Sequence, residues 1–193
     1  MLDWLESIDR DIVLFINGMH HPVLDEVMWV ISAKLPWIPF YIFLLYLFFR
    51  KSSWKETGLF LLVAIAAVGL SDLISSQIIK EFVMRYRPSH HSLLTDKLNF
   101  YTLSDGEPYK GGMFGFVSSH AANFFAVCTI AYLVLREWYP RMIWVFAVAV
   151  IVSISRLYLG VHYLSDLICG GLIGALMAWL LYRFVFLTLR TKV

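Results

Sequence analysis

The chain has 193 residues, of which 60% are hydrophobic and 17% aromatic, and its mean hydropathy is +0.70. An ordinary soluble domain is about 45–50% apolar, so this composition excludes a typical soluble protein and predicts one integral-membrane domain over residues 1–193. The formal net charge is +2 and no basic stripe is present, which excludes a nucleic-acid partner and leaves the lipid bilayer as the expected surroundings.

The first 22 residues predict a helix at the membrane interface. Their apolar side chains recur at helical spacing among acidic ones, at Leu2, Leu5, Ile8, Ile12 and Phe15. The acidic start and the missing cleavage site exclude a cleavable signal peptide. The same spacing fits a short packing helix equally well, and the sequence leaves both interpretations open.

Five apolar stretches approach the roughly 20 residues that a spanning helix needs. They cover residues 27–49, 57–79, 121–135, 142–159 and 164–189. Pro36 and Pro39 predict a kink in the first stretch or its division into two half-helices. The third stretch is short, so we expect residues 117–120 to form its first turn. The predicted fold is therefore an all-α, polytopic membrane helical bundle with about five transmembrane helices.

Cations gather in the loops after the first and third stretches and towards the C-terminal end of the chain. They are Arg50, Lys51, Lys55, Arg136, Arg141, Arg183, Arg190 and Lys192. Cytoplasmic loops are enriched in Lys and Arg, so this side is expected to be cytoplasmic. The sequence then predicts a multi-pass protein of the bacterial inner membrane whose opposite side faces the periplasm or the cell exterior.

Residues 88–116 form the one long stretch between predicted spans. Glycines, prolines and aromatic residues alternate there with charges, which indicates an ordered extracytoplasmic cap loop. The two cysteines, Cys128 and Cys169, lie inside apolar stretches without the spacing of a disulfide or zinc site. We expect them to be packing residues.

Three groups of polar residues stand at the outer ends of the predicted spans. They are Lys80 with Arg87-Pro88, Ser118-Ser119-His120, and Arg156 with His162 and Asp166. Polar groups at membrane depth are costly and are usually functional. Three fixed cations, two histidines and a carboxylate are suited to binding a phosphate and transferring it through histidine.

Spacing suggests how the first group is arranged. Lys80 and Arg87 are seven residues apart, close to two helical turns, so they share one face if the second span continues through Tyr86. Pro88 would then end the helix. Arg85 is predicted to anchor the span at the lipid headgroups.

The other two groups also predict local geometry. His162 and Asp166 are four residues apart, which predicts one helical face on which the carboxylate accepts from one ring nitrogen and leaves the other free. Ser118 is a candidate N-cap, and the helix start behind it favours an anion.

In order and spacing, the three groups resemble the type 2 phosphatidic acid phosphatase (PAP2) family, membrane relatives of bacterial acid phosphatases and vanadium haloperoxidases. The resemblance covers residues 57–185. The family usually has Pro-Ser-Gly-His where this chain has Val-Ser-Ser-His at residues 117–120. Ser119 therefore carries a side chain where glycine would leave the phosphate more room.

The resemblance implies a PAP2/haloperoxidase-like core and a role for each matched residue. It implies five phosphate-binding residues, namely Lys80, Arg87, Ser118, Ser119 and Arg156. It further implies that His162 attacks phosphorus, that Asp166 orients the His162 ring, and that His120 protonates the departing oxygen. Neither a metal nor another cofactor is expected.

The predicted function is a membrane phosphatase that acts on a lipid phosphate through a phosphohistidine. We expect undecaprenyl diphosphate as the substrate, by analogy only; lipid A phosphatase and phosphatidylglycerol phosphate phosphatase are the alternatives. A transporter of anions is the alternative from a different class, but transporter charges lie near the bilayer midplane on inverted repeats. The oligomeric state is left open.

Other polar residues receive structural interpretations. The pairs His20-His21 and His90-His91 are expected at the surface, because adjacent histidines diverge on a helix and no carboxylate spacing supports a metal site. Asp72, within the second span, is expected to face another helix.

Overall fold

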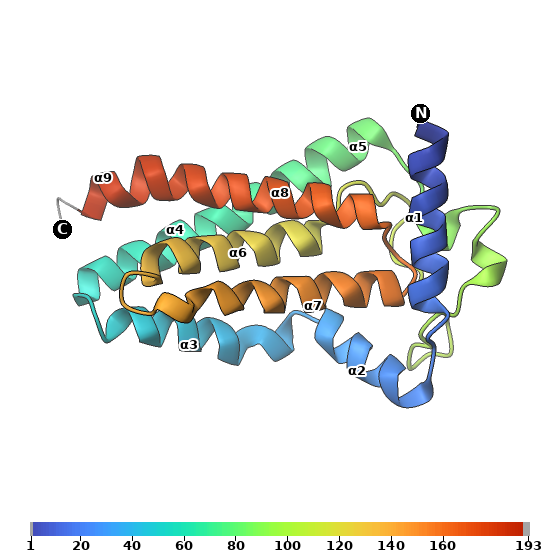
Figure 1. The fold of residues 1–193 in the computed structure, drawn as a ribbon, viewed down its shortest axis with the longest axis horizontal. Coiled ribbons are helices and arrows are strands. Elements are labelled where there is room, and N and C mark those ends of the chain that lie inside the picture. The colour runs from blue at the N-terminus through green and yellow to red at the C-terminus, as the bar shows by residue number, and fades with distance from the viewer. Residues whose placement is uncertain (1, 191–193) are drawn as a thin grey trace.

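An all-α bundle accounts for the part of the chain that the computed structural model describes, residues 2–190 (Figure 1). The segment before the cap loop contains α1 (Leu2–Asn17), α2 (Pro22–Ser32), the 3-10 turn η1 (Leu35–Trp37), α3 (Ile38–Phe49), α4 (Trp54–Asp72), the π-helical segment η2 (Leu73–Ile79) and α5 (Lys80–Val83). After the cap loop follow α6 (Ser119–Leu135), η5 (Pro140–Trp144), α7 (Val145–Tyr158), α8 (Leu164–Leu181), η6 (Tyr182–Phe186) and α9 (Leu187–Arg190).

Three continuous helical segments are long and apolar enough to cross a membrane, over Trp54–Val83, Pro140–Tyr158 and Leu164–Arg190. A fourth crossing is possible if Pro22–Ser32 and Leu35–Phe49, which bend by 68° at their junction, form one broken span. The predicted division at the prolines is therefore confirmed. The third predicted span is the apolar but shorter helix Ser119–Leu135, so the all-α membrane bundle is confirmed and length alone supports three or four crossings.

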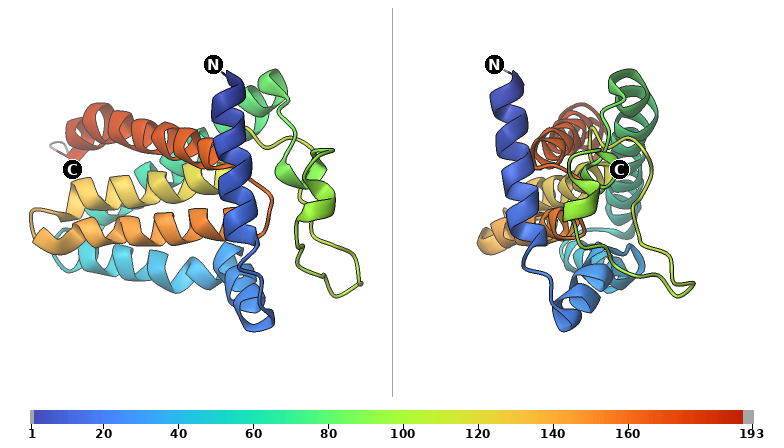
Figure 2. Two further views of the ribbon diagram at one scale, coloured as in Figure 1. Left: turned by 45° about the vertical axis from the view of Figure 1, so that its right-hand side comes forward. Right: turned by 90° about the vertical axis from the view of Figure 1, so that its right-hand side faces the viewer.

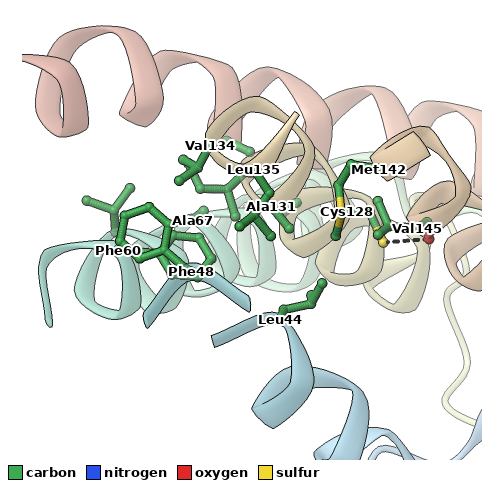
Figure 3. Close-up of a cluster of buried hydrophobic side chains, with 14 of the residues drawn as sticks. Leu44, Phe48, Phe60, Ala67, Cys128, Ala131, Val134, Leu135, Met142 and Val145 are labelled. Carbon is green, nitrogen blue, oxygen red and sulfur yellow. Dashed lines mark hydrogen bonds between the residues drawn. The ribbon is translucent and has the colours of Figure 1, made fainter. Parts of the chain in front are cut away.

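Helix α6 lies at the centre of the bundle, surrounded by α4, α7 and α8 (Figure 1). The main apolar core joins it to the ends of α3 and α4, where the Phe48 and Phe60 rings lie 4.9 Å apart between centroids (Figure 3). Cys128 is buried in this core, and its Sγ donates to the Val145 carbonyl at 3.2 Å. The packing role predicted for this cysteine fits its position.

Helix α1 crosses the end of the bundle rather than running along it (Figures 1 and 2). Its buried face is Asp9, Val13 and Asn17, whereas apolar Leu5 and Phe15 point outward with exposed fractions of 51% and 68%. Exposed carboxylates accompany these apolar side chains on the outward face, a mixture that fits a helix lying in the membrane interface. The inward polar residues also require partners inside the protein, because unpaired buried polar groups are costly.

The cap loop lies beside α1 over the same end of the bundle (Figure 2). It contains the 3-10 turns η3 (Pro88–His90) and η4 (Thr95–Lys97). Asn17 ties it to α1, because its side chain accepts from the Asn99 backbone nitrogen and donates to the Asn99 carbonyl, both at 2.8 Å. Tyr101 stacks on Trp29 of α2 with ring centroids 4.5 Å apart. These contacts make it an ordered cap.

The opposite end of the bundle collects the helix ends that carry the predicted cytoplasmic cations. The α3–α4 turn, the α6–η5 turn and the end of α9 meet there (Figure 1). Arg190 Nε lies 2.7 Å from Glu56 Oε1, which links α9 to the start of α4. Lys192 lies outside the described residues.

Candidate active site

The three polar groups of the sequence meet under the cap, at the bundle end where α5 stops and α6 and α8 begin. Arg87 Nη1 lies 2.8 Å from His162 Nε2 and donates to the Val161 carbonyl at 2.9 Å. The Ser118 backbone nitrogen donates to the Asp166 carbonyl at 3.0 Å. Residues far apart in sequence therefore share one site.

His162 and Asp166 form the predicted pair, but they do not share a helical face. Helix α8 begins at Leu164, so His162 belongs to the preceding turn. Asp166 Oδ2 accepts from the Tyr163 backbone nitrogen at 3.0 Å and lies 3.3 Å from His162 Nδ1. The carboxylate both caps the start of α8 and contacts the imidazole. The expected contact is therefore present, but the expectation that both residues share a helical face was wrong, because His162 precedes the helix.

The geometry favours a neutral imidazole with its lone pair on Nε2. Burial lowers the pKa of His162 well below its ordinary value, and the charges of Arg87 and Arg156 lower it further. With Nδ1 donating to Asp166, Nε2 carries the lone pair and accepts from Arg87 Nη1 at 2.8 Å. A neutral nitrogen beside a fixed cation is the arrangement that an attack on an anionic phosphate ester requires.

Lys80 and Arg87 do not lie on one helix face as predicted. Helix α5 ends at Val83, Met84 is left-handed with φ 49°, and Arg87 is extended. The chain leaves the helix because it pairs with the end of the cap: the Arg87 nitrogen donates to the Met113 carbonyl at 3.1 Å. Both cations nevertheless line one cavity of about 260 Å³.

Pro88 was also placed incorrectly as the end of the second span. It opens the short 3-10 turn η3, five residues beyond the last residue of α5. The physical reason is the same, since backbone pairing with the cap replaces helical hydrogen bonds before the proline is reached.

Arg156 is held from two sides. Its Nη1 donates to Ser32 Oγ of α2, and its Nη2 donates to Tyr109 Oη of the cap at 3.0 Å. Burial and the charge of Arg156 lower the pKa of Arg87 to about 10, so the two guanidiniums are both buried and mutually repulsive. An anion bound beside them would relieve that repulsion.

Several predicted phosphate-binding residues carry buried polar atoms that have no protein partner within residues 2–190. These atoms are Arg87 Nε, Ser119 Oγ and Arg156 Nε. Buried polar groups are normally hydrogen-bonded, and each such exception needs an explanation. A phosphate, with several acceptor oxygens, would satisfy donors of this kind. Ser118 caps α6, and its fully buried Oγ accepts from the Ala121 nitrogen at 3.5 Å.

His120 stands in the first turn of α6, where it lines a groove of about 610 Å³ between α3, α4 and α6. Lys34 and Asn123 line the groove together with His120. Its remaining lining residues, which include Phe60 and Ile130, are almost entirely apolar. The groove therefore runs from the site along the apolar bundle.

The family model of the PAP2 superfamily matches residues 57–190. The chain belongs to the PAP2 superfamily. As a PAP2 protein it is a membrane-bound, metal-independent lipid phosphate phosphatase, as predicted.

Two curated relatives and one solved structure are similar over nearly the whole chain. Lipid A 4'-phosphatase of Porphyromonas gingivalis is 32% identical over 192 residues, which is 99% of this chain and 78% of the relative. Lipid A 4'-phosphatase of Bacteroides thetaiotaomicron is 33% identical over 185 residues, which is 94% of this chain and 79% of the relative. The transmembrane PAP2-type phosphatidylglycerolphosphate phosphatase from Bacillus subtilis superposes with a TM-score of 0.65 at 26% identity, covering 93% of this chain and 85% of that one.

One residue of this PAP2 site was misjudged from the sequence. Arg85 was predicted to anchor lipid headgroups, but its guanidinium lies 3.0 Å from Asp166 Oδ1 and 2.8 Å from Asp9 Oδ2. Had the end of α5 been placed at Val83, an extended chain would have put Arg85 and Arg87 on one side, because side chains two apart in a strand share a face.

The remaining polar residues behave more simply. Asp72 faces another helix as expected, and its Oδ1 accepts from Asn123 Nδ2 of α6 at 2.9 Å. His20 is exposed and lies 2.9 Å from Asp25 Oδ2. Within residues 2–190, no group of three or more His, Cys, Asp or Glu side chains is placed to hold a metal ion.

Proposed function

We propose that this protein removes phosphate from a lipid through a phosphohistidine formed on His162. The observation that carries the proposal is the placement of the imidazole, with Nδ1 on Asp166 and Nε2 on Arg87. Nε2 lies directly beside a phosphate-binding guanidinium. A phosphate that takes over the hydrogen bond from Arg87 would therefore lie within reach of the Nε2 lone pair.

The reaction has two steps. In the first, His162 Nε2 attacks phosphorus, an N–P bond forms, the P–O bond to the lipid breaks, and His120 donates a proton to the departing oxygen. In the second, water attacks phosphorus and gives a proton to His120 while the N–P bond breaks, which releases inorganic phosphate. Lys80, Arg87 and Arg156 stabilise the negative charge that develops on the phosphoryl oxygens.

The groove beside His120 supports a lipid as the departing group. The residue proposed to protonate the departing oxygen stands at one end of an apolar groove of about 610 Å³. The group attached to that oxygen would therefore extend along α3, α4 and α6, where apolar walls suit a hydrocarbon chain. A hydrophilic phosphate ester would gain nothing from these walls.

Lipid A carrying a phosphate monoester is the proposed substrate. Two relatives of about one-third identity over nearly the whole chain are lipid A 4'-phosphatases, which favours the alternative over undecaprenyl diphosphate. Phosphatidylglycerol phosphate is the second candidate, because the similar solved structure acts on that lipid. Its headgroup offers the same terminal phosphate to the site.

A phosphate-release panel in detergent micelles tests the substrate. The purified protein is given monophosphorylated lipid A, phosphatidylglycerol phosphate, phosphatidate and undecaprenyl diphosphate, and kcat/KM is compared. We expect the highest value for lipid A phosphate. A preference for undecaprenyl diphosphate would contradict the substrate assignment but not the phosphatase, whereas release from none of the four would contradict the phosphatase and favour the transporter.

The protein is a bacterial membrane protein, and we propose that it lies in the inner membrane with the site facing the periplasm. The support is the separation of charges: the cation-bearing helix ends lie opposite the end that holds the site and the cap (Figure 1). An outward site would meet lipids exposed on the outer leaflet of that membrane.

Thiol labelling tests this orientation. Ser104→Cys places a thiol on the exposed cap, and Lys51→Cys places one in the exposed α3–α4 turn. In cells with a permeabilised outer membrane, an impermeant maleimide should label position 104 and spare position 51, because only the cap faces the periplasm. The parent chain, with Cys128 buried and Cys169 half-buried, gives the background. Labelling at 51 but not at 104 would reverse the topology.

A further inference from the structure

Arg85 joins the N-terminal helix to the proposed catalytic carboxylate. Its Nη1 donates to Asp166 Oδ1 at 3.0 Å and to Ser165 Oγ at 2.7 Å, and its Nη2 donates to Asp9 Oδ2 at 2.8 Å. The guanidinium also lies over the Tyr163 ring, 4.1 Å from its centroid. One side chain thus contacts α1 and the start of α8.

These contacts fix the orientation of the Asp166 carboxylate. Oδ2 accepts from His162 Nδ1 and from the Tyr163 nitrogen, while Oδ1 accepts from Arg85. The Asp166 side chain is fully buried, so Oδ1 would be a desolvated, unpaired anionic oxygen without the guanidinium. The carboxylate would then rotate towards other donors and release the imidazole.

Asp9 supplies the other half of this arrangement from α1. Its exposed fraction is 5%, and besides Arg85 it accepts from the Ser165 nitrogen at 3.0 Å and from Ser165 Oγ. A guanidinium beside Asp166 alone would compete with His162 for the negative charge of that carboxylate. A second carboxylate on the far side of Arg85 offsets this competition.

We propose that Arg85 is a positioning residue for the Asp166–His162 pair, and that Asp9 holds Arg85 in place. Asp9, Arg85 and Asp166 together form a clamp, which makes α1 part of the catalytic apparatus. The inference rests on the proposed role of His162. Arg85 is assigned to positioning and not to phosphate binding because its terminal nitrogens are bound to the carboxylates of Asp9 and Asp166. Arg87 and Arg156 instead each keep a buried Nε with no protein partner within residues 2–190. The N-terminal helix therefore does more than cover the bundle.

Steady-state kinetics on dioctanoyl phosphatidate in micelles tests the clamp. Arg85→Gln should lower kcat about 100-fold, the effect of a misplaced nucleophile, and leave KM unchanged. Asp9→Asn should lower kcat about tenfold, since it removes one charge-assisted hydrogen bond. Arg85→Lys should recover part of the activity, because an ammonium keeps the charge but loses the bidentate geometry.

Matched controls lie on the same helix. Arg10→Gln removes an arginine whose partner is the exposed Glu6, 3.8 Å away, and Asp11→Asn removes an exposed carboxylate; neither should change kcat. Wild-type kcat in Arg85→Gln or a raised KM at unchanged kcat would overturn the clamp. If Arg85→Gln does not fold, wild-type kcat in both Asp9→Asn and Arg85→Lys overturns it. His162→Ala distinguishes failure of the proposed function from failure of this inference. An active His162→Ala variant would defeat the proposed function itself. An inactive His162→Ala variant together with a normal Arg85→Gln variant would defeat only the inference about Arg85.

Discussion

Replacing His162 with alanine should lower kcat by more than about 10⁴-fold while the protein stays folded. The reason is that His162 Nε2 is the only atom assigned to the bond with phosphorus, and the cations alone can bind the phosphate but cannot replace a nucleophile. The imidazole is buried, so its removal also leaves a small space beside Arg87. Vanadate should still bind to the remaining cations, which gives a test of folding that is independent of turnover.

Asp166→Asn provides the matched change in the same pair. The amide keeps the shape of the carboxylate but loses its charge at both His162 and Arg85, so kcat should fall severely with the ring still present. Phosphate release is measured for both variants, and a labelled phosphoenzyme trapped by rapid quenching is sought in the parent. Near-normal turnover in His162→Ala, or label on another residue, would defeat the phosphohistidine mechanism.

Much of the fold could be predicted because spans are encoded by composition alone. A run of about 20 apolar residues has few alternatives to a helix in lipid, since backbone groups must be satisfied within the segment. The divided first span also followed from local chemistry, because Pro36 and Pro39 interrupt helical hydrogen bonding. Ser118 was recognisable as an N-cap for a similar reason.

The ends of the helices were harder to predict because tertiary contacts decide them. Nothing local requires α5 to stop at Val83; the chain turns there since the segment around Arg87 pairs with the cap. That turn is what brings Arg85 to Asp166. A side chain that acts through partners 76 and 81 residues away in sequence has no periodic signal, so the sequence suggested a headgroup anchor instead.

The contact between α6 and α8 sets the distance between the half of the site on α6 and the half at the start of α8. It depends on two glycines of α8, which have no side chain. An added Cβ at Gly170 would overlap the Ser118 carbonyl oxygen, and one at Gly174 would overlap that of Ala122. The two helices therefore touch backbone to backbone where α6 carries His120 and α8 carries Asp166. Small residues at every fourth position permit this close approach in membrane helices.

Gly170→Ala should therefore separate the halves of the site. The methyl group meets backbone, which cannot rotate away, so the helix starts must move apart by roughly 1 Å, and a displacement of that size lowers kcat about 100-fold. Gly58→Ala is the matched control, because nothing lies within 4 Å of a Cβ added there, the position does not line the groove, and alanine favours the helix. Phosphate release and thermal unfolding in detergent are measured for both variants. Wild-type kcat in Gly170→Ala, or an equal loss in Gly58→Ala, would show that this backbone contact does not set the distance between the general acid and the nucleophile.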